Sequence, residues 1–172
     1  IEATSQGGDW RLALFDNPRN LLQPLDATGA ALMYEGELMT AGDVPSTVEI
    51  RSLFAWLQGR ADDELFQCNS LSRLNPALAS MSPLASGVIA IRLAADTGEY
   101  LAWFRKEQLH DVTWAGDPNK VTLGADPLDL SPRRSFAEWH QIVRDTATPW
   151  EPRELALARA VGASLTDLIL QI

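Results

Sequence analysis

Cysteine is nearly absent from this sequence: Cys68 is the single cysteine in 172 residues. One cysteine excludes an internal disulfide and any metal site built from several thiolates. The chain must therefore rely on apolar burial, and its 46% hydrophobic content is enough for one substantial core. We interpret Cys68 as a buried packing residue, because no activating partner for its thiol is evident. The lack of disulfides favours a reducing, cytoplasmic location.

Basic residues and long apolar runs are also scarce. The chain has 14 Lys and Arg against 23 Asp and Glu, a net charge of -9. This balance argues against binding to nucleic acid or to an anionic membrane surface, since both require clustered positive charge. No run approaches the roughly 18 apolar residues of a membrane helix, and no N-terminal signal pattern is present.

Histidine occurs only twice, at His110 and His140. The two are far apart in sequence and show neither metal-ligand spacing nor a nucleophile motif. No glycine-rich phosphate loop is present either. We therefore predict that the chain is not an enzyme and holds no metal.

The strongest helix signal begins near residue 46. Ser46 and Glu49 have the spacing of a capping box, in which each side chain accepts a hydrogen bond from an unpaired N–H of the first turn. Gly59 stands where a left-handed C-terminal cap is expected. The helix between them would bury one apolar face made of Ile50, Leu53, Phe54 and Leu57.

Hairpin signals alternate with helix signals along the first two thirds of the chain. Residues 30–40 predict two short strands around Glu35-Gly36, and residues 87–95 and 99–105 predict an antiparallel hairpin. Weaker helices are expected over 9–15, ended by Pro18, and over 71–78, where Pro76 makes the extent uncertain. Helices interleaved with antiparallel hairpins predict an α+β fold, one sheet with helices packed on it.

Residues 111–147 differ in character from the rest. They contain several glycines, prolines and aspartates, and few residues that would anchor them in a core. A connection of this length in a compact domain is usually functional or disordered. Trp114 and Trp139 are large side chains for such a segment and suggest a partner surface, although each could equally fold back onto its own domain.

The segment 131–139 is compatible with two backbone conformations. As a strand, it would place Arg133 and Ser135 on one face. As a helix, it would start with a capping box formed by Ser135 and Glu138, with Phe136 and Trp139 on one side. Spacing alone does not decide between them, and a segment with two conformations is a candidate switch.

The order of residues in this segment carries a family resemblance. Pro132-Arg133-Arg134-Ser135-Phe136 resembles the Pro-Arg-x-Ser-Phe motif of the phytochrome "tongue", and Trp114-Ala115-Gly116 resembles its Trp-Gly/Ala-Gly motif. Trp139 falls where a further tryptophan of that family stands. The chain is therefore similar to the PHY domain of a bacterial phytochrome. The motifs occupy residues 114–139 only, but the preceding strands and the following helix also fit such a domain.

The resemblance implies a function. A PHY domain has a GAF-like fold, and its tongue, about 111–147 here, covers the bilin pocket of the neighbouring GAF domain in the same parent chain. The bilin, expected to be biliverdin, is held by that GAF domain and not covalently by this chain. By this resemblance Pro132, Arg133, Ser135 and Phe136 contact the chromophore pocket, with Arg133 and Ser135 alternating at a pocket aspartate.

The same resemblance gives a role to three further residues, and the sequence departs from the family pattern at one point. Trp114, Gly116 and Trp139 would take part in the tongue's change between strand and helix. Trp139 is not followed by the acidic residue often found in the family. No role is carried over to Arg134 or Lys120.

The C-terminal residues predict a long helix over about 151–172. From Pro152 onward the apolar residues repeat at spacings of 3 and 4, the pattern of a coiled-coil seam: Ala158, Val161, Leu165, Leu168 and Ile172. The family resemblance favours a signalling helix that pairs in a parallel homodimer and leads to an output module such as a histidine kinase. The alternative is an amphipathic helix packed on its own sheet. Because the sequence starts at Ile1 and stops within this pattern, we expect a piece of a longer protein.

Two functions from different classes remain open on sequence grounds. The first is the PHY module of a red/far-red light sensor. The second is a GAF-like regulatory domain that binds a small molecule beneath a lid loop.

Overall fold

A single antiparallel sheet forms the centre of the molecule. The computed structural model describes residues 9–60, 64–94, 98–108 and 144–170. Within them, five strands are arranged in the order β2-β1-β5-β4-β3. Their bounds are β1 Gly29–Tyr34, β2 Glu37–Gly42, β3 Leu65–Cys68, β4 Gly87–Ala94 and β5 Glu99–Arg105. The expected α+β architecture is confirmed. The predicted tongue hairpin falls mainly on residues 109–143, outside the described residues.

Both predicted hairpins form, and the turn of the first shows why. β1 and β2 pair from Gly29↔Gly42 to Tyr34↔Glu37, which leaves Glu35 and Gly36 as a two-residue loop. Both loop residues have positive φ, 51° and 78°, as a tight hairpin turn requires. β4 and β5 pair antiparallel in the same way. β5 also pairs with β1, so the later hairpin lies against the earlier one in the middle of the sheet.

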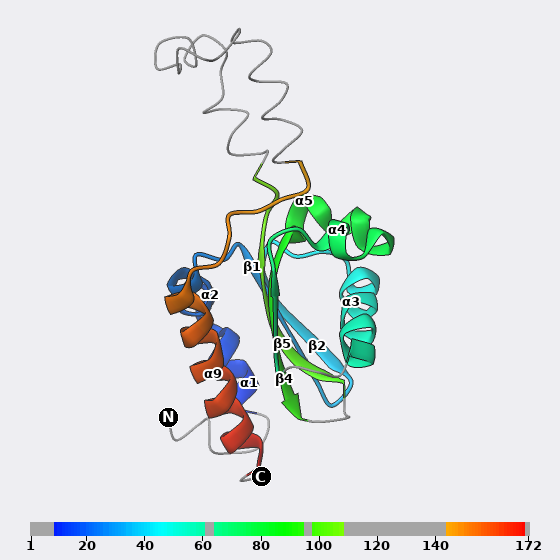
Figure 1. Ribbon diagram of the computed structural model, residues 1–172. Helices are drawn as coiled ribbons and strands as arrows, with labels where there is room; N and C mark the ends of the chain where they lie inside the picture. The colour runs from blue at the N-terminus through cyan, green and yellow to red at the C-terminus, as the bar shows by residue number, and fades with distance from the viewer. Residues whose placement is uncertain (1–8, 61–63, 95–97, 109–143, 171–172) are drawn as a thin grey trace, which may run out of the picture.

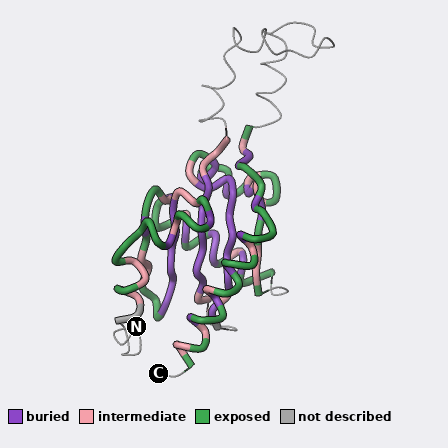
Figure 2. The backbone as a smooth tube through the Cα atoms, turned by 90° about the vertical axis from the view of Figure 1, so that its left-hand side faces the viewer, coloured by how far each residue is buried: buried purple, intermediate pink, exposed green. Residues whose placement is uncertain are grey.

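Helices cover both faces of the sheet (Figure 1). α3 (Thr47–Arg60), α4 (Leu71–Leu74) and α5 (Ser82–Ala85) lie on one face, and α1 (Asp9–Asp16), α2 (Pro18–Leu22) and α9 (Pro152–Leu170) on the other. Two apolar clusters fill the two interfaces, one on each side of the sheet. The inner strands β1, β4 and β5 are accordingly the most buried part of the described chain, whereas the edge strands β2 and β3 are partly exposed. The outer sides of the helices are exposed (Figure 2). The described residues also contain two short 3₁₀ helices, η2 Gln23–Leu25 and η3 Pro76–Met81.

The capping box of α3 is confirmed, but its predicted end is wrong. The Ser46 N–H donates to the Glu49 carboxylate over 2.9 Å, and the Glu49 N–H donates to the Ser46 hydroxyl over 3.2 Å. The predicted apolar face is buried. Gly59, however, lies inside α3 and is not among the residues with positive φ, so it does not form a left-handed cap. Helical hydrogen bonding simply continues through it to Arg60.

Other local predictions hold with altered limits. The helix predicted at 9–15 is observed as α1. Pro18, which was expected to end this helix, is the first residue of α2. The weak helix at 71–78 is divided: α4 ends at Leu74, and Pro76 starts η3 with the Asn75 side chain capping it through the Ala77 N–H. β3 was not predicted. It is a four-residue strand at the edge of the sheet, paired only with β4 among the described strands.

α9 packs on its own sheet, which is the alternative left open for the C-terminal helix. Its buried residues are Glu154, Ala158, Gly162 and Leu165, and its main partner in the sheet is β4. A Cβ placed on Gly162 would collide with the Ile91 side chain, so the two backbones approach closely. The Thr166 hydroxyl donates to the Leu93 carbonyl at 3.1 Å. Ala158 and Leu165, predicted to lie in a seam between helices, therefore face the sheet.

Candidate functional site

The two ends of the long connection between β5 and α9 lie side by side. The chain leaves the sheet at the end of β5 and returns at residues 144–151, at the end of the sheet where α4 and α5 lie (Figure 1). The Gln108 N–H donates to the Thr146 carbonyl at 2.5 Å, and the Asp145 N–H donates to the Glu107 carboxylate at 2.7 Å. The connection is thus closed at its base by hydrogen bonds from both sides.

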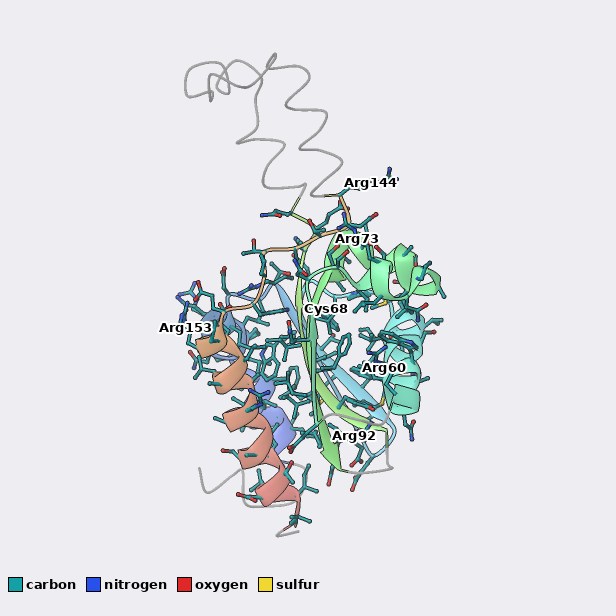
Figure 3. The ribbon with its side chains drawn as sticks, viewed as in Figure 1. Arg60, Cys68, Arg73, Arg92, Arg144 and Arg153 are labelled. Carbon is teal, nitrogen blue, oxygen red and sulfur yellow. The ribbon has the colours of Figure 1, made fainter. Side chains whose placement is uncertain are left out.

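This base is also attached to the loop before α4. The Ala147 N–H donates to the Asn69 carbonyl at 2.8 Å, and the Ser70 hydroxyl donates to the Asp145 carbonyl at 3.0 Å. Arg73, on α4, extends toward the backbone at Arg144 and donates to its carbonyl at 3.2 Å (Figure 3). The start of the returning segment, residues 144–147, is therefore fixed to the body of the domain as well as to the chain just after β5.

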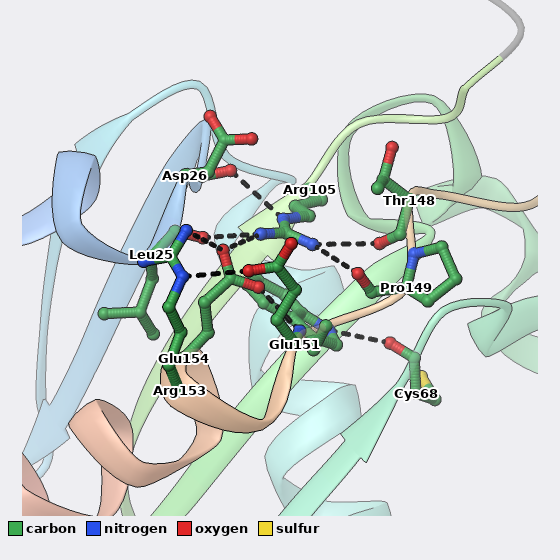
Figure 4. Close-up of polar contacts among 10 residues, drawn as sticks. Leu25, Asp26, Cys68, Arg105, Thr148, Pro149, Glu151, Arg153 and Glu154 are labelled. Carbon is green, nitrogen blue, oxygen red and sulfur yellow. Dashed lines mark hydrogen bonds and ion pairs between the residues drawn. The ribbon is translucent and has the colours of Figure 1, made fainter.

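Arg105, the last residue of β5, is the centre of the polar contacts just below this base (Figure 4). Its Nη1 donates to the Thr148 and Pro149 carbonyls, each at 3.0 Å. Its Nε donates to the Asp26 carbonyl at 3.1 Å, and its Nη2 to the Leu25 carbonyl at 2.7 Å. One side chain from the outgoing strand thus holds the returning segment and the N-terminal helical region together.

The fifth donor of Arg105 forms an ion pair with the first turn of α9. Nη2 lies 2.7 Å from Glu154 Oε2, and the two side chains are only 6% and 3% exposed. The other carboxylate oxygen, Oε1, accepts from the Glu151 N–H at 2.7 Å, which is the N3 half of a capping box at the start of α9. A single carboxylate therefore both caps α9 and fixes it to β5.

Trp150 completes this cluster. The Arg105 guanidinium carbon lies 3.9 Å from the centroid of the Trp150 ring, a cation–π contact in a buried setting. The indole N–H donates to the Cys68 carbonyl at 3.0 Å. We call Arg105, Trp150 and Glu154 the Arg105 cluster. It joins β5, β3, the returning segment, the N-terminal region and α9.

Sequence reasoning missed the Arg105 cluster. Arg105 was assigned only as the end of a strand, and Glu154 only as part of a helix. A possible signal was the order Trp-Glu-Pro-Arg-Glu at 150–154, because Pro at the first helical position followed by Glu at the third marks a capped helix start. Nothing in the local pattern identifies an arginine 49 residues earlier as the partner.

The residues predicted from the family resemblance lie outside the described residues. These are Pro132, Arg133, Ser135 and Phe136 of the pocket contacts and Trp114, Gly116 and Trp139 of the switch. His110 and His140 also lie there. The structure therefore describes the base of the predicted tongue and not its motifs.

Cys68 is buried, as predicted, and sits on β3 facing the interior (Figure 3). Burial raises the pKa of its thiol to about 11, so the thiolate is scarce at neutral pH. In the part of the chain that the structure describes, no group of His, Cys, Asp and Glu is placed to hold a metal ion. Across the same residues, no helix combines the length and apolar character needed to cross a membrane.

A cavity of about 480 Å³ lies beside the edge strand β3. Its lining includes Leu65, Phe66 and three arginines, Arg60, Arg92 and Arg159. Arg60 stacks over Phe66, and Arg92 lies near the hydroxyl of Tyr100, so two of the three arginines already have aromatic partners. None of the Arg105 cluster lines this cavity.

Comparison with known proteins gives consistent matches. The family profile for the phytochrome region, PHY, matches residues 1–172. Cyanobacterial phytochrome B from Nostoc sp. is 31% identical over 173 residues, covering 99% of this chain and 23% of that protein. The phytochrome-like protein Cph1 from Synechocystis sp. is 32% identical over 174 residues, again 99% of this chain and 23% of that protein.

A bacterial relative and a solved structure agree with these matches. A bacteriophytochrome from Xanthomonas campestris is 30% identical over 156 residues, 86% of this chain and 25% of that protein. The crystal structure of bacteriophytochrome RpBphP3 from R. palustris superposes with a TM-score of 0.70 at 25% identity, covering 98% of this chain and 34% of that one. The chain thus spans about a quarter of the length of the curated relatives it matches.

Proposed function

The chain belongs to the phytochrome-region (PHY) family of phytochrome photoreceptors, and from that premise we propose that it is the PHY module of a red/far-red light sensor. Its tongue, about residues 111–147 of the single domain 1–172, covers the bilin pocket of the neighbouring GAF domain. The bilin, expected to be biliverdin, is bound by that GAF domain of the parent. Cys68 supports a non-covalent role for this chain, because its thiol is buried and its pKa is raised to about 11.

The observation that supports this proposal best is the closed base of the connection. The chain leaves β5 and returns to the same end of the sheet, and the two ends are tied to each other between Gln108 and Thr146 and between Glu107 and Asp145. Both family motifs lie between these ties. An arm with such a base can reach a neighbouring domain while its attachment to the sheet stays in place.

The chemistry at the far end of the arm rests on Arg133 and Ser135. In one photostate the Arg133 guanidinium pairs with an aspartate beside the bilin, and in the other Ser135 replaces it. Truncating one partner of a desolvated charge pair costs about 2–5 kcal/mol, enough to bias two tongue conformations strongly. Pro132 and Phe136 contact the pocket, and Trp114, Gly116 and Trp139 repack as the tongue changes between strand and helix.

The output leaves through α9. We propose that the tongue change is relayed to an output module of the parent, such as a histidine kinase, and that the parent forms a parallel homodimer through its C-terminal helix. Ala158 and Leu165 pack on the sheet, so a dimer contact on α9 has to use exposed residues such as Leu157. This chain itself needs no catalytic activity for such a role.

The test is the red/far-red difference spectrum of the parent protein assembled with biliverdin, recorded for the wild type and for Arg133→Ala. Arg134→Ala, the same truncation one residue along, is the matched control. We expect the wild type and the control to photoconvert and Arg133→Ala to lose formation or stability of one photostate. Absence of photochemistry in the wild type would refute the light-sensor proposal and favour a small-molecule regulatory domain instead. Equal spectra for all three would remove Arg133 from the mechanism.

A further inference from the structure

The Arg105 cluster joins the end of β5, the returning segment and the first turn of α9, which link the base of the long connection to the C-terminal helix. The returning segment is held at the Thr148 and Pro149 carbonyls, and α9 is held at Glu154 two residues into its first turn. Both are held by the same guanidinium, which belongs to the strand where the outgoing arm starts. Figure 4 shows these contacts converging on Arg105 from opposite sides.

Every donor of this guanidinium is in use. An arginine has five N–H groups, and Arg105 directs one from Nε and two from each terminal nitrogen to protein acceptors. The side chain is only 6% exposed, so solvent water has little access to replace an acceptor that Arg105 loses. A displacement of the returning segment must therefore either break bonds to a buried charge or move Arg105, and with it Glu154.

The carboxylate of Glu154 carries the displacement into the helix. One of its oxygens is bound by Arg105, and the other accepts the Glu151 N–H that starts α9. Shifting or releasing this carboxylate changes the capping of the first turn and the attachment of α9 to β5 at once. The planar guanidinium is also stacked on Trp150, which fixes its orientation.

We infer that Arg105 is the positioning residue that couples the returning segment, at the base of the tongue, to the first turn of α9. This inference rests on the proposed light-sensor function and specifies where its relay passes through the domain. It predicts that the cluster can be altered without preventing the bilin from switching, because the pocket contacts lie in the tongue and not at its base. The light response of α9 should then be lost separately from the photochemistry.

The experiment uses the full parent protein assembled with biliverdin. Amide hydrogen exchange of residues 152–170 is measured in the dark and under saturating light, together with the red/far-red difference spectrum. The variants are Arg105→Lys, which keeps the charge but loses the planar fork, and Glu154→Gln, which keeps a hydrogen-bonding carbonyl but loses the charge. Arg159→Gln, an exposed charge on the same helix, is the control.

The expected result separates the two readouts. The light–dark difference in α9 exchange should fall about fivefold or more in both cluster variants, the lower range of ordinary coupling between sites. Their difference spectra, and both readouts in Arg159→Gln, should match the wild type. A purely structural role for Arg105 predicts instead that the α9 response persists, or that spectrum and response decline together, and either result would overturn the inference.

A second variant keeps the test decisive if the single substitutions unfold the domain. Replacing the pair together, Arg105→Met with Glu154→Leu, removes both charges, so no buried charge is left unpaired, although four backbone carbonyls lose the donors of Arg105. If this double variant folds and α9 still responds to light as in the wild type, the inference is wrong. Absence of photoconversion in the wild-type parent would instead refute the proposed function itself, so the two failures are distinguishable.

Discussion

Substituting alanine for glycine in α9 and in α3 should have opposite effects on stability. Both Gly162 and Gly59 lie inside helices, and neither has positive φ. In a helix interior, alanine is favoured over glycine by up to about 1 kcal/mol. At Gly59 a Cβ would meet nothing within 4 Å, so Gly59→Ala should keep part or all of this gain. At Gly162 the added Cβ would collide with Ile91.

The collision decides the sign at Gly162. Overfilling a packed interface costs typically about 1–3 kcal/mol, and here the obstacle is a β-branched side chain on the central part of β4, which has little freedom to turn away. The overlap with Ile91 Cγ2 is severe, so the upper part of this range, about 2–3 kcal/mol, applies. Subtracting a helix propensity gain of about 1 kcal/mol leaves an expected destabilisation of about 1–2 kcal/mol for Gly162→Ala. At this chain length that corresponds to a fall in Tm of about 2–8 °C.

Thermal and urea unfolding followed by far-UV circular dichroism would measure both effects. A double-mutant cycle with Ile91→Ala identifies the cause, because Gly162→Ala should cost less or become favourable when the Ile91 side chain is absent. If Gly162→Ala is as stable as the wild type, α9 does not pack on β4 as closely as the contact between Gly162 and Ile91 requires.

Three other results are expected. Glu154→Ala leaves the buried Arg105 charge unpaired and should cost about 3–5 kcal/mol in urea unfolding, whereas the same substitution made in an Arg105→Met background, where no charge is left unpaired, should cost much less; equal losses in the two backgrounds would contradict the ion-pair account. The hydrogen bond from the Ser80 hydroxyl, and to a smaller extent the bonds from Ser46, lower the pKa of the Glu49 carboxyl. Ionised Glu49 therefore stabilises the folded domain above the ordinary glutamate pKa, and this stabilisation is lost as the pH falls through the lowered pKa. Acid unfolding of Glu49→Gln should therefore show a shallower loss of stability than the wild type, and an unchanged acid limb would argue against that contribution. Because burial raises the pKa of Cys68 to about 11, its alkylation at pH 8, followed by mass spectrometry, should be slow in the native domain and fast in urea. Rapid alkylation of the folded protein would mean that the thiol is accessible.

Elements specified by short-range chemistry were predictable from the sequence. The capping box at Ser46 and Glu49 and the Glu35-Gly36 turn are contacts between residues a few positions apart, so their spacing carries the information. β3 was missed for the opposite reason. A run of four residues is too short to show a clear strand pattern, and it becomes a strand because β4 is available to pair with it.

The helix ends show a similar limit. Gly59 could have ended α3 in a left-handed turn, but glycine is equally able to continue a helix, and the sequence does not say which. Pro76 did end the preceding helix, because proline removes a hydrogen-bond donor wherever it stands. A residue that forbids a conformation is therefore a better predictor than a residue that only permits one.

The sequence by itself determined the sheet hairpins, the buried face of α3 and, through two motifs, the family. Only the tertiary structure decided what each buried face meets. Ala158 and Leu165 repeat with a spacing that suits a partner helix or a sheet equally well, since apolar burial has no direction and any apolar surface satisfies it. Arg105 and Glu154 likewise became partners only when β5 and the start of α9 were brought together, where a buried charge must find its opposite.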